Sequence, residues 1–452
     1  MTLALLVVAL LLLVYLPVIH GQEVMDDRSA ILEDSRWVNK NWKGLYQIDY
    51  IKLKKLWIPF YRPIYRALTY LTWLPCRSLE ALHFGNVLIQ GAGVVVVYFL
   101  AAALGYDPLL AALVFAVHPL ATEAVANNCR RSSLLSGVLW GLTALCVATG
   151  HYYLAVISFG LALFAKEDAP GIFGAAIQQL YVKRDVGNKK MEAAGLDVSL
   201  PQPAYTITSI VAHAKAIPAW FWGLDQNVDH HVKEPTTGGL IYTTIVLGLL
   251  FTLAPTPILL LLFLSPLVGY FFVPIQDILV EHRAYTLTFI FALLWSDVLS
   301  SLPVWVTVIM VAWFGAMAAW RSFGFSTPLR FWFSAYRDGS AKKLRVLLML
   351  ASSHQLRGDI ETATRYNREV LETYPRQGIA IANIALSHIM KAQLSFTTGK
   401  PKEGIDNVRE AWRLVQEAKG YCPEDASVET CYKQIEGIKN QVEAQVEAQK
   451  VS

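Results

Sequence analysis

The chain has 452 residues, of which 54% are hydrophobic and only 16% are charged, and its mean hydropathy is +0.39. About a quarter of the residues of a soluble globular protein are charged, so the composition excludes that class and indicates an integral membrane protein. The formal net charge of +4 favours neither a nucleic-acid partner nor a strong tether to anionic lipids.

Apolar runs recur along most of the chain. A helix needs roughly 20 mostly apolar residues to cross a bilayer, and the runs predict an all-α, polytopic transmembrane bundle with about eleven spans. The spans are expected at residues 2–19, 82–104, 109–121, 132–150, 152–165, 170–182, 203–222, 239–253, 257–273, 285–300 and 303–320. We expect the first run to be a retained helix rather than a cleaved signal peptide, because it has no basic region and no A-x-A site follows it.

Alternating the spans from a cytoplasmic N-terminus predicts the side of each loop. The one long inside loop, residues 183–202, contains the basic stretch KRDVGNKK, in agreement with the positive-inside rule. The charged and polar motifs between the other spans then all lie on the outer side, which is periplasmic or lumenal. Charged groups at the mouth of a bundle are costly unless they are solvated or paired, so these motifs are the first functional candidates.

The first outer loop, residues 20–81, is not expected to cross the membrane. Its segment 39–75 mixes lysine, arginine, tryptophan and tyrosine with apolar residues at helical spacing. This pattern predicts helices that lie in the membrane interface, where they can shape a groove for a lipid.

The chain is expected to form a second, outer domain over residues 323–452. Its amphipathic periodicity predicts helical hairpins with turns at Gly358 and Gly399, Pro375 closing the first hairpin, and a capping helix near 428–445. The pattern resembles tetratricopeptide repeats. A solenoid of so few repeats is expected to need contacts with the membrane domain or with a partner protein for its stability.

Two of the five cysteines, Cys422 and Cys431, lie near the end of the chain. On the predicted topology they lie in the outer compartment, where disulfide bonds persist. We therefore predict a bridge that pins the capping helix. The alternative is a pair of free thiols that are neighbours only in sequence.

Several short motifs together resemble one family. They are MDDRSAIL at residues 25–32, YRPIYRALTYL at 61–71, FAVHPLATEAV at 115–125, RSSLLSG at 131–137, KED at 166–168 and EHRAY at 281–285. Their order, over nearly the whole chain, is similar to that of the transmembrane and tetratricopeptide-repeat protein O-mannosyltransferases and their bacterial relatives. The resemblance implies a GT-C-type bundle in residues 1–322, followed by repeats on the outer side. The chain departs from the family at Arg130, where the family usually has glycine.

The resemblance also implies an activity, the transfer of a mannose-like sugar from dolichyl or undecaprenyl phosphate to a protein hydroxyl. No cofactor is required for it. The implied general base is the acidic residue that follows the first span, Asp27 or Asp26, and a carboxylate suits that work. Asp27 is preferred by its place in the family's Asp-Asp pair. The alternative is a solvating pair at a helix end, with Arg28 as its ion-pair partner.

Cations must hold the leaving phosphate. The candidates are Arg283, Arg131, His282, Lys166 and Arg130. Arginine makes paired, charge-assisted bonds to phosphate oxygens and lysine acts as a point charge. We prefer Arg283 and Arg131, since each belongs to a motif. For each cation the alternative is a side chain that snorkels or pairs within a loop.

A further group of polar residues is expected to orient hydroxyls of the sugar or the acceptor: His118, Glu123, Glu167 and Glu281. The alternative is a structural network at helix ends. No metal site is predicted in DQNVDHHVKE, because adjacent histidines rarely chelate one ion; a divalent ion at Asp26 and Asp27 remains an alternative. The chain has no glycine-rich phosphate loop, G-x-S-x-G motif or dinucleotide fingerprint.

Two rival classes remain beside the transferase. One is a non-catalytic scaffold derived from a GT-C bundle, with a tail that binds a partner protein or complex. The other is a transporter, which needs polar residues at mid-span, and these spans have few. The partners expected for the transferase are membrane lipids, the polyprenyl-phosphate donor and an acceptor protein or complex bound by the tail, with no nucleic acid.

Overall fold

The computed structural model describes residues 2–24, 49–53, 56–60, 62–73, 75–166, 202–227, 230, 237–253, 263–267, 279–340 and 344–451. The chain forms two compact units, Met1–Ser334 and Ala335–Ser452. The boundary follows Ser334 rather than residue 322, because the chain beyond residue 322 still packs with the first unit. There the backbone N–H of Gln22 donates a hydrogen bond of 2.9 Å to the Ser326 carbonyl oxygen.

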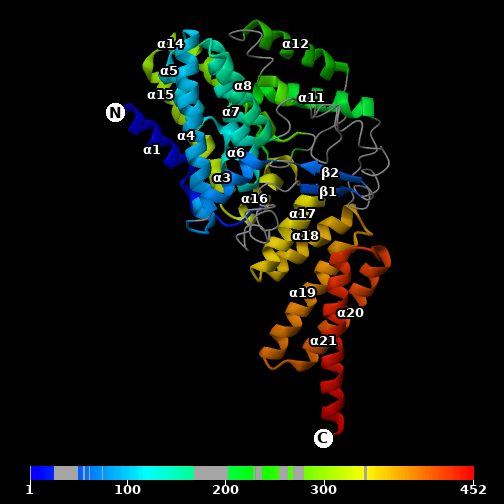
Figure 1. The fold of residues 1–452 in the computed structure, drawn as a ribbon. Helices are drawn as coiled ribbons and strands as arrows, with labels where there is room; N and C mark the ends of the chain where they lie inside the picture. Colours follow the sequence, from blue (N-terminus) through cyan, green and yellow to red (C-terminus); the bar gives the residue numbers. More distant parts are fainter. Residues whose placement is uncertain are drawn as a thin grey trace. The chain divides into compact units, whose positions relative to one another are not determined.

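The first unit is almost wholly helical, as predicted (Figure 1). Its α-helices are α1 Thr2–Ile19, α3 Pro63–Trp73, α4 Leu79–Leu104, α5 Pro108–Val117, α6 Thr122–Ala126, α7 Arg131–Ala148, α8 Tyr152–Ala165, α11 Gln202–Phe221, α12 Thr237–Leu253, α14 Leu287–Ser300, α15 Val304–Gly324 and α16 Pro328–Ala335. Three short 3₁₀ turns stand between them, η3 Pro119–Ala121, η4 Asn128–Arg130 and η5 Glu281–Ala284. The turns η3 and η4 flank the TEAV motif, and η5 contains the EHR motif.

One part of the predicted interfacial segment is not helical. Strands β1, Asp49–Leu53, and β2, Leu56–Phe60, pair antiparallel, with Asp49 opposite Phe60 and Leu53 opposite Leu56. The β-branched and aromatic residues of DYIKL and LWIPF favour strands, which the helical reading of residues 39–75 overlooked. Among the described residues of that segment, only α3, near its end, is the predicted kind of amphipathic helix.

Several helices are long and apolar enough to cross a membrane. Among the described residues these are Leu79–Leu104, Asn128–Ala148, Val304–Gly324 and Gly378–Thr397, and the bent pair Pro108–Val117 with Pro119–Ala126 is a fifth candidate. Gly378–Thr397 is a helix of the second unit that packs against its neighbours there. Shorter apolar helices stand at Val7–Ile19, Tyr152–Ala165, Thr237–Leu249 and Leu287–Ser300. The count of eleven spans is not established, and the runs at 170–182 and most of 257–273 lie outside the described residues.

The core of the first unit brings α4, α5, α7 and α14 together. The Phe115 ring of α5 packs against the rings of Phe289 and Tyr285, at centroid distances of 4.6 and 6.1 Å. Helix α7 presents Gly137 and Gly141 to Tyr285 and Phe289, and a Cβ on either glycine would collide with these rings. Small residues one turn apart let helices approach closely in membranes. This packing holds Tyr285, and η5 just before it, against α7.

The turn between α4 and α5 follows from local sequence. Gly105 adopts a positive φ of 81° and ends α4. The Asp107 side chain then accepts hydrogen bonds from the backbone N–H groups of Leu109 and Leu110, both at 2.9 Å, and Pro108 occupies the first turn of α5. An aspartate cap followed by proline is a strong start signal for a helix. A short turn therefore separates the apolar runs expected at 82–104 and 109–121.

The second unit is a stack of helical hairpins. Its helices are α17 Leu344–Leu356, α18 Ile360–Thr373, α19 Gly378–Thr397, α20 Pro401–Tyr421 and α21 Ala426–Val451, preceded by a π-helical turn, η6 Tyr336–Ser340. Each of these α-helices packs on its neighbours in the chain. Gly358 and Gly399 both have a positive φ, of 78° and 73°, and stand in the turns predicted for them. Pro375 lies just after α18, as predicted.

Cys422 and Cys431 are free thiols, so the predicted disulfide is not formed in this structure. The local packing directs the two sulfurs to apolar surroundings instead. The Cys422 Sγ lies 2.8 Å from where a Cβ on Gly378 would stand, and Cys431 packs in the apolar cluster of α19, α20 and α21. Burial raises the pKa of the Cys431 thiol. It therefore remains protonated and poorly reactive.

The close approach of α19 and α20 at Gly378 predicts a local stability effect. In Gly378→Ala the new Cβ would stand 2.8 Å from the Cys422 Sγ and 2.9 Å from the Ala418 carbonyl oxygen. Overpacking of this kind costs roughly 1–3 kcal/mol. We expect amides of α19 and α20 to exchange faster in hydrogen–deuterium exchange measured on the full chain. Gly420→Ala is the matched control, because nothing lies within 4 Å of the place that its Cβ would take and alanine favours a helix; slower exchange is expected there.

Candidate functional site

The first half of the site is a carboxylate–imidazole pair. Glu123 of α6 is almost fully buried. Its Oε1 lies 2.7 Å from Nδ1 of His282 in η5, and its Oε2 accepts a hydrogen bond of 3.0 Å from the His282 backbone N–H. The TEAV and EHR motifs, far apart in the chain, therefore meet at one point. The Glu123 carboxylate fixes both the backbone and the ring of His282.

The bend that positions Glu123 is built by His118 and Pro119. Helices on either side of His118 differ in direction by 48°. The His118 Nδ1 accepts a hydrogen bond of 3.3 Å from the Leu120 backbone N–H. Its ring lies between Phe291 and Phe314, at centroid distances of 5.6 and 5.0 Å. His118 therefore caps the short turn η3, and its predicted role toward a substrate hydroxyl stays a prediction.

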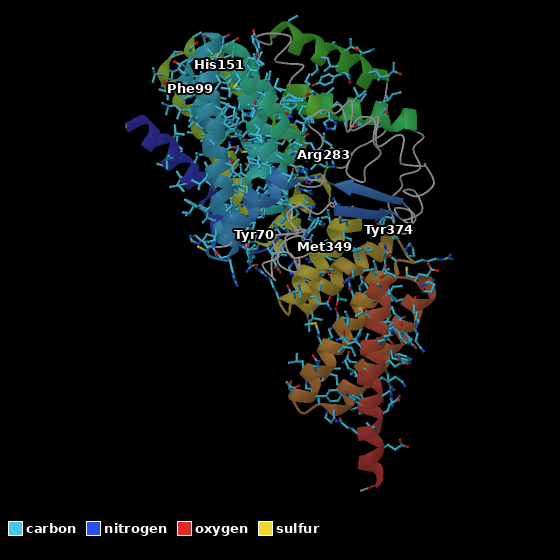
Figure 2. The ribbon with its side chains drawn as sticks, in the orientation of Figure 1. Tyr70, Phe99, His151, Arg283, Met349 and Tyr374 are labelled. Carbon is cyan, nitrogen blue, oxygen red and sulfur yellow. The ribbon has the colours of Figure 1, made fainter. Side chains whose placement is uncertain are left out.

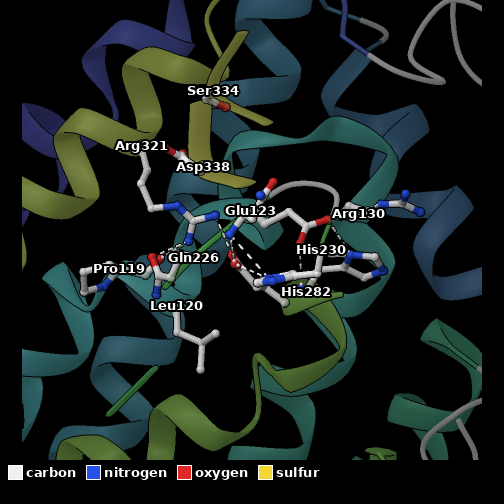
Figure 3. A network of polar contacts seen from close by, with 12 residues as sticks. Pro119, Leu120, Glu123, Arg130, Gln226, His230, His282, Arg321, Ser334 and Asp338 are labelled. Atoms are coloured by element: carbon white, nitrogen blue, oxygen red, sulfur yellow. Dashed lines mark hydrogen bonds and ion pairs between the residues drawn. The ribbon is translucent and has the colours of Figure 1, made fainter. Parts of the chain in front are cut away.

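The second half of the site surrounds Glu281, which is fully buried. Its Oε1 accepts a hydrogen bond of 2.6 Å from the Asn227 backbone N–H and lies 3.0 Å from Nε2 of His230. Its Oε2 forms an ion pair with Arg321 of α15. The Arg321 guanidinium also donates to the Pro119 carbonyl oxygen, at 3.2 Å, and to Gln226. Figure 3 shows this network around the segment that carries His282.

Cations surround His282. Nε of Arg130 lies 3.9 Å from Oε1 of Glu123, and the charges of Arg130 and Lys166 both act on the His282 ring. Lys166 is buried at the end of α8. Arg130 has a φ of −95° in the 3₁₀ turn before α7, a conformation open to any residue, so the departure from glycine at this position costs no backbone strain. Arg130 and Lys166, two of the five predicted cations, are thus near His282, which is a third.

Arg283 and Arg131 stand elsewhere. Arg283 is half-buried (labelled in Figure 2) and near enough to His213 of α11 for their charges to interact. The buried Arg131 donates from Nε to Asn86 at 2.6 Å, from Nη1 to Thr72 at 2.6 Å and from Nη2 to the Leu82 carbonyl. The Arg131 guanidinium therefore joins α3 and α4 to the start of α7.

Three of the predicted site residues cannot be compared with the geometry. Asp26, Asp27 and Glu167 lie outside the described residues. Within the described ranges no group of three or more histidine, cysteine, aspartate or glutamate side chains could hold a metal ion. The alternative of a divalent ion at Asp26 and Asp27 concerns residues beyond those ranges.

The sequence reading missed several residues of the site. Arg321 is a lone cation at the end of an apolar span, and Asn86 and Gln90 are polar residues inside another. Nε2 of Gln90 donates to the Phe115 carbonyl oxygen at 3.1 Å, and its Oε1 accepts from the Tyr285 hydroxyl at 2.6 Å. A polar residue within a membrane span is costly and marks a candidate by default. That signal was present in the sequence at all three positions.

The fold and site define a helical protein with several helices able to cross a membrane, a buried charged cluster at helix ends, and a second unit of helical hairpins. No family model matches the chain, and no curated protein or solved structure is significantly similar to it.

Proposed function

We propose that the chain is an integral membrane glycosyltransferase. It transfers a mannose-like sugar from dolichyl or undecaprenyl phosphate to a protein hydroxyl on the periplasmic or lumenal face. The observation that carries the proposal is the meeting of two distant motifs in one buried cluster, with Glu123 bonded to His282 at 2.7 Å and the charges of Arg130 and Lys166 acting on the same ring. Perturbed, paired charges of this kind concentrate at functional sites.

The proposed reaction needs a base, cations and a lipid groove. The Asp27 carboxylate takes the proton of the acceptor hydroxyl. At the same time the oxygen of that hydroxyl forms a bond to the anomeric carbon of the sugar. The bond between that carbon and the phosphate oxygen breaks, and the phosphate leaves on its lipid. Cations near His282 hold the phosphate charge. The amphipathic helix α3 is suited to lie along the lipid at the membrane surface.

The proposal extends to the second unit. The hairpins of α17 to α20 and the helix α21 are compatible with short tetratricopeptide-like repeats, whose stacked helices commonly bind other proteins. In this role the unit recruits the acceptor protein or a partner complex on the same side of the membrane as the site.

The competing proposal is a non-catalytic membrane scaffold with a partner-binding tail. The observation that favours it is the engagement of the charged groups with one another. The Glu281 carboxylate accepts a hydrogen bond from Asn227 and pairs with His230 and Arg321. The Arg131 guanidinium donates hydrogen bonds to Thr72 and Asn86. A buried network with all its partners can serve the fold alone.

A transfer assay separates the two proposals. The purified protein in lipid nanodiscs is supplied with radiolabelled dolichyl-phosphate mannose and, in parallel, undecaprenyl-phosphate mannose, together with proteins from a lumenal or periplasmic extract. The transferase passes label to protein from at least one donor. A scaffold leaves all label in the lipid fraction while the tail still retains bound proteins.

The proposed sidedness predicts a labelling pattern. In a chain without its native cysteines, we expect Lys190→Cys to react with an impermeant maleimide only from the cytoplasmic side. Ser340→Cys should react only from the outer side, because the proposed topology puts the two positions on opposite faces. Reaction of both from one side would overturn the topology and, with it, the proposed position of the site.

A further inference from the structure

Glu123 restricts the protonation of His282. The Glu123 carboxylate is an acceptor, and both of its oxygens face His282, at 2.7 Å from Nδ1 and 3.0 Å from the backbone nitrogen. The short contact at Nδ1 requires a proton on that nitrogen. In a neutral imidazole the other nitrogen then has a lone pair and no proton. Glu123 therefore makes Nε2 of His282 a hydrogen-bond acceptor.

The surroundings keep the His282 ring neutral. Burial, together with the positive charges of Arg130 and Lys166, lowers the pKa of His282 to about 3 despite the opposing effect of Glu123. A neutral ring whose proton is on Nδ1 cannot donate from Nε2. Nε2 of His282 therefore keeps a lone pair that can accept a hydrogen bond.

The partner that would complete this arrangement is a hydroxyl group. Within the part of the chain that the structure describes, the hydrogen bonds of His282 all go to Glu123. The buried Nε of Arg130, in the same cluster, makes no hydrogen bond to any described residue. An acceptor atom beside a cationic donor matches a ligand that has a hydroxyl group close to a phosphate.

From this geometry we infer that His282 is a binding residue whose Nε2 accepts a hydrogen bond from a sugar hydroxyl of a sugar phosphate, with Arg130 and Lys166 beside it for the phosphate. The inference rests on the proposed function, because it names the part of the donor that this site holds. It assigns Glu123 a positioning role, since that carboxylate acts on the ligand through the His282 ring.

The alternative role for His282 is a clamp that only holds Glu123, and two substitutions separate the roles. In His282→Asn the amide nitrogen takes the place of Nδ1 and can still donate to Glu123, while nothing replaces Nε2. In His282→Gln the terminal amide reaches the place of Nε2 and its oxygen can accept from the ligand. If His282 binds the ligand, glutamine should preserve sugar phosphate binding better than asparagine. If His282 only holds Glu123, asparagine should preserve sugar phosphate binding better than glutamine.

The test measures binding of mannose 1-phosphate and of inorganic phosphate to the full-length protein in nanodiscs by isothermal titration calorimetry. We expect the wild type to bind mannose 1-phosphate more tightly than inorganic phosphate. His282→Asn should weaken sugar phosphate binding roughly 3- to 10-fold, the size expected for one lost hydrogen bond, and leave phosphate binding unchanged. His282→Gln should keep most of the preference.

Several outcomes would overturn the inference: no preference for the sugar phosphate in the wild type, no binding of it at all, or equal losses for both ligands in both variants. A wild type that binds mannose 1-phosphate with the expected variant pattern, yet transfers no sugar in the assay above, leaves the inference standing and removes the proposed transferase function.

Discussion

Replacement of Asp27 by asparagine should lower the rate of sugar transfer by roughly 10²–10⁴-fold, the range expected when a general base is lost. Asparagine keeps the volume of the side chain but cannot take the proton of the acceptor hydroxyl. The measurement is transfer of radiolabelled sugar from the polyprenyl-phosphate donor under single-turnover conditions, with donor binding measured separately. Donor affinity should stay close to that of the wild type.

The matched control is Asp297→Asn. Asp297 is an exposed aspartate on α14, and the same exchange there should leave the rate unchanged. Asp26→Asn tests the choice within the pair, and a smaller loss is expected than for Asp27. A rate near that of the wild type in Asp27→Asn, or a larger loss in Asp26→Asn, would contradict the assignment of Asp27 as the base.

Replacement of Arg321 by methionine should destabilise the first unit by roughly 3–5 kcal/mol, the usual cost of removing one partner of a buried ion pair. The substitution leaves the fully buried Glu281 without its cation. It also removes the donors to the Pro119 carbonyl oxygen and to Gln226. The midpoint of thermal unfolding in detergent reports the effect. It is followed by a thiol-reactive dye in a chain whose other cysteines are replaced, so that only the buried Cys146 can react.

Two comparisons test the reason for this loss. Arg413→Met removes an arginine whose side chain is 59% exposed and ion-paired with Glu410, and exposed pairs contribute only about 0–1 kcal/mol, so the midpoint should hardly move. The double variant Arg321→Met/Glu281→Leu removes both charges and should recover part of the stability. A double variant less stable than Arg321→Met alone would contradict the explanation by an unpaired buried charge.

The helical elements were accessible to sequence reasoning because their causes are local. Periodic apolar runs predicted the helices of both units, and Gly358 and Gly399 predicted turns that have the expected positive φ. The strands β1 and β2 were missed because lysines and aromatic residues with apolar residues at helical spacing also fit an interfacial helix. The free state of Cys422 was missed for another reason: its sulfur lies against Gly378, a contact between helices that no local pattern encodes.

The site was less accessible. The motifs gave the residue types, and Glu123, His282, Arg130 and Lys166 do lie together. The pairing of Glu123 with His282 joins residues 159 positions apart, and hydrophobic periodicity contains no information on such contacts.

Arg321 illustrates a second limit. Its lone positive charge marks it as a candidate, but its partner Glu281 can be identified only when the bundle is assembled. The hydrogen bonds from Arg131 to Asn86 and Thr72 likewise form only when three helices are packed together.

The 159-residue separation of Glu123 and His282 also has a consequence for biosynthesis. The ribosome completes α6 long before it adds η5. During that interval the newly inserted chain contains Glu123 but not His282, its hydrogen-bond partner. A carboxylate without a partner is costly to bury, so we expect Glu123 to stay in contact with water or with the insertion machinery during that interval. The bonds between Glu123 and His282 can form only after residue 282 has been added. A chain truncated before η5 would keep this acid exposed, which gives cellular quality control a physical feature by which to distinguish unfinished molecules from complete ones.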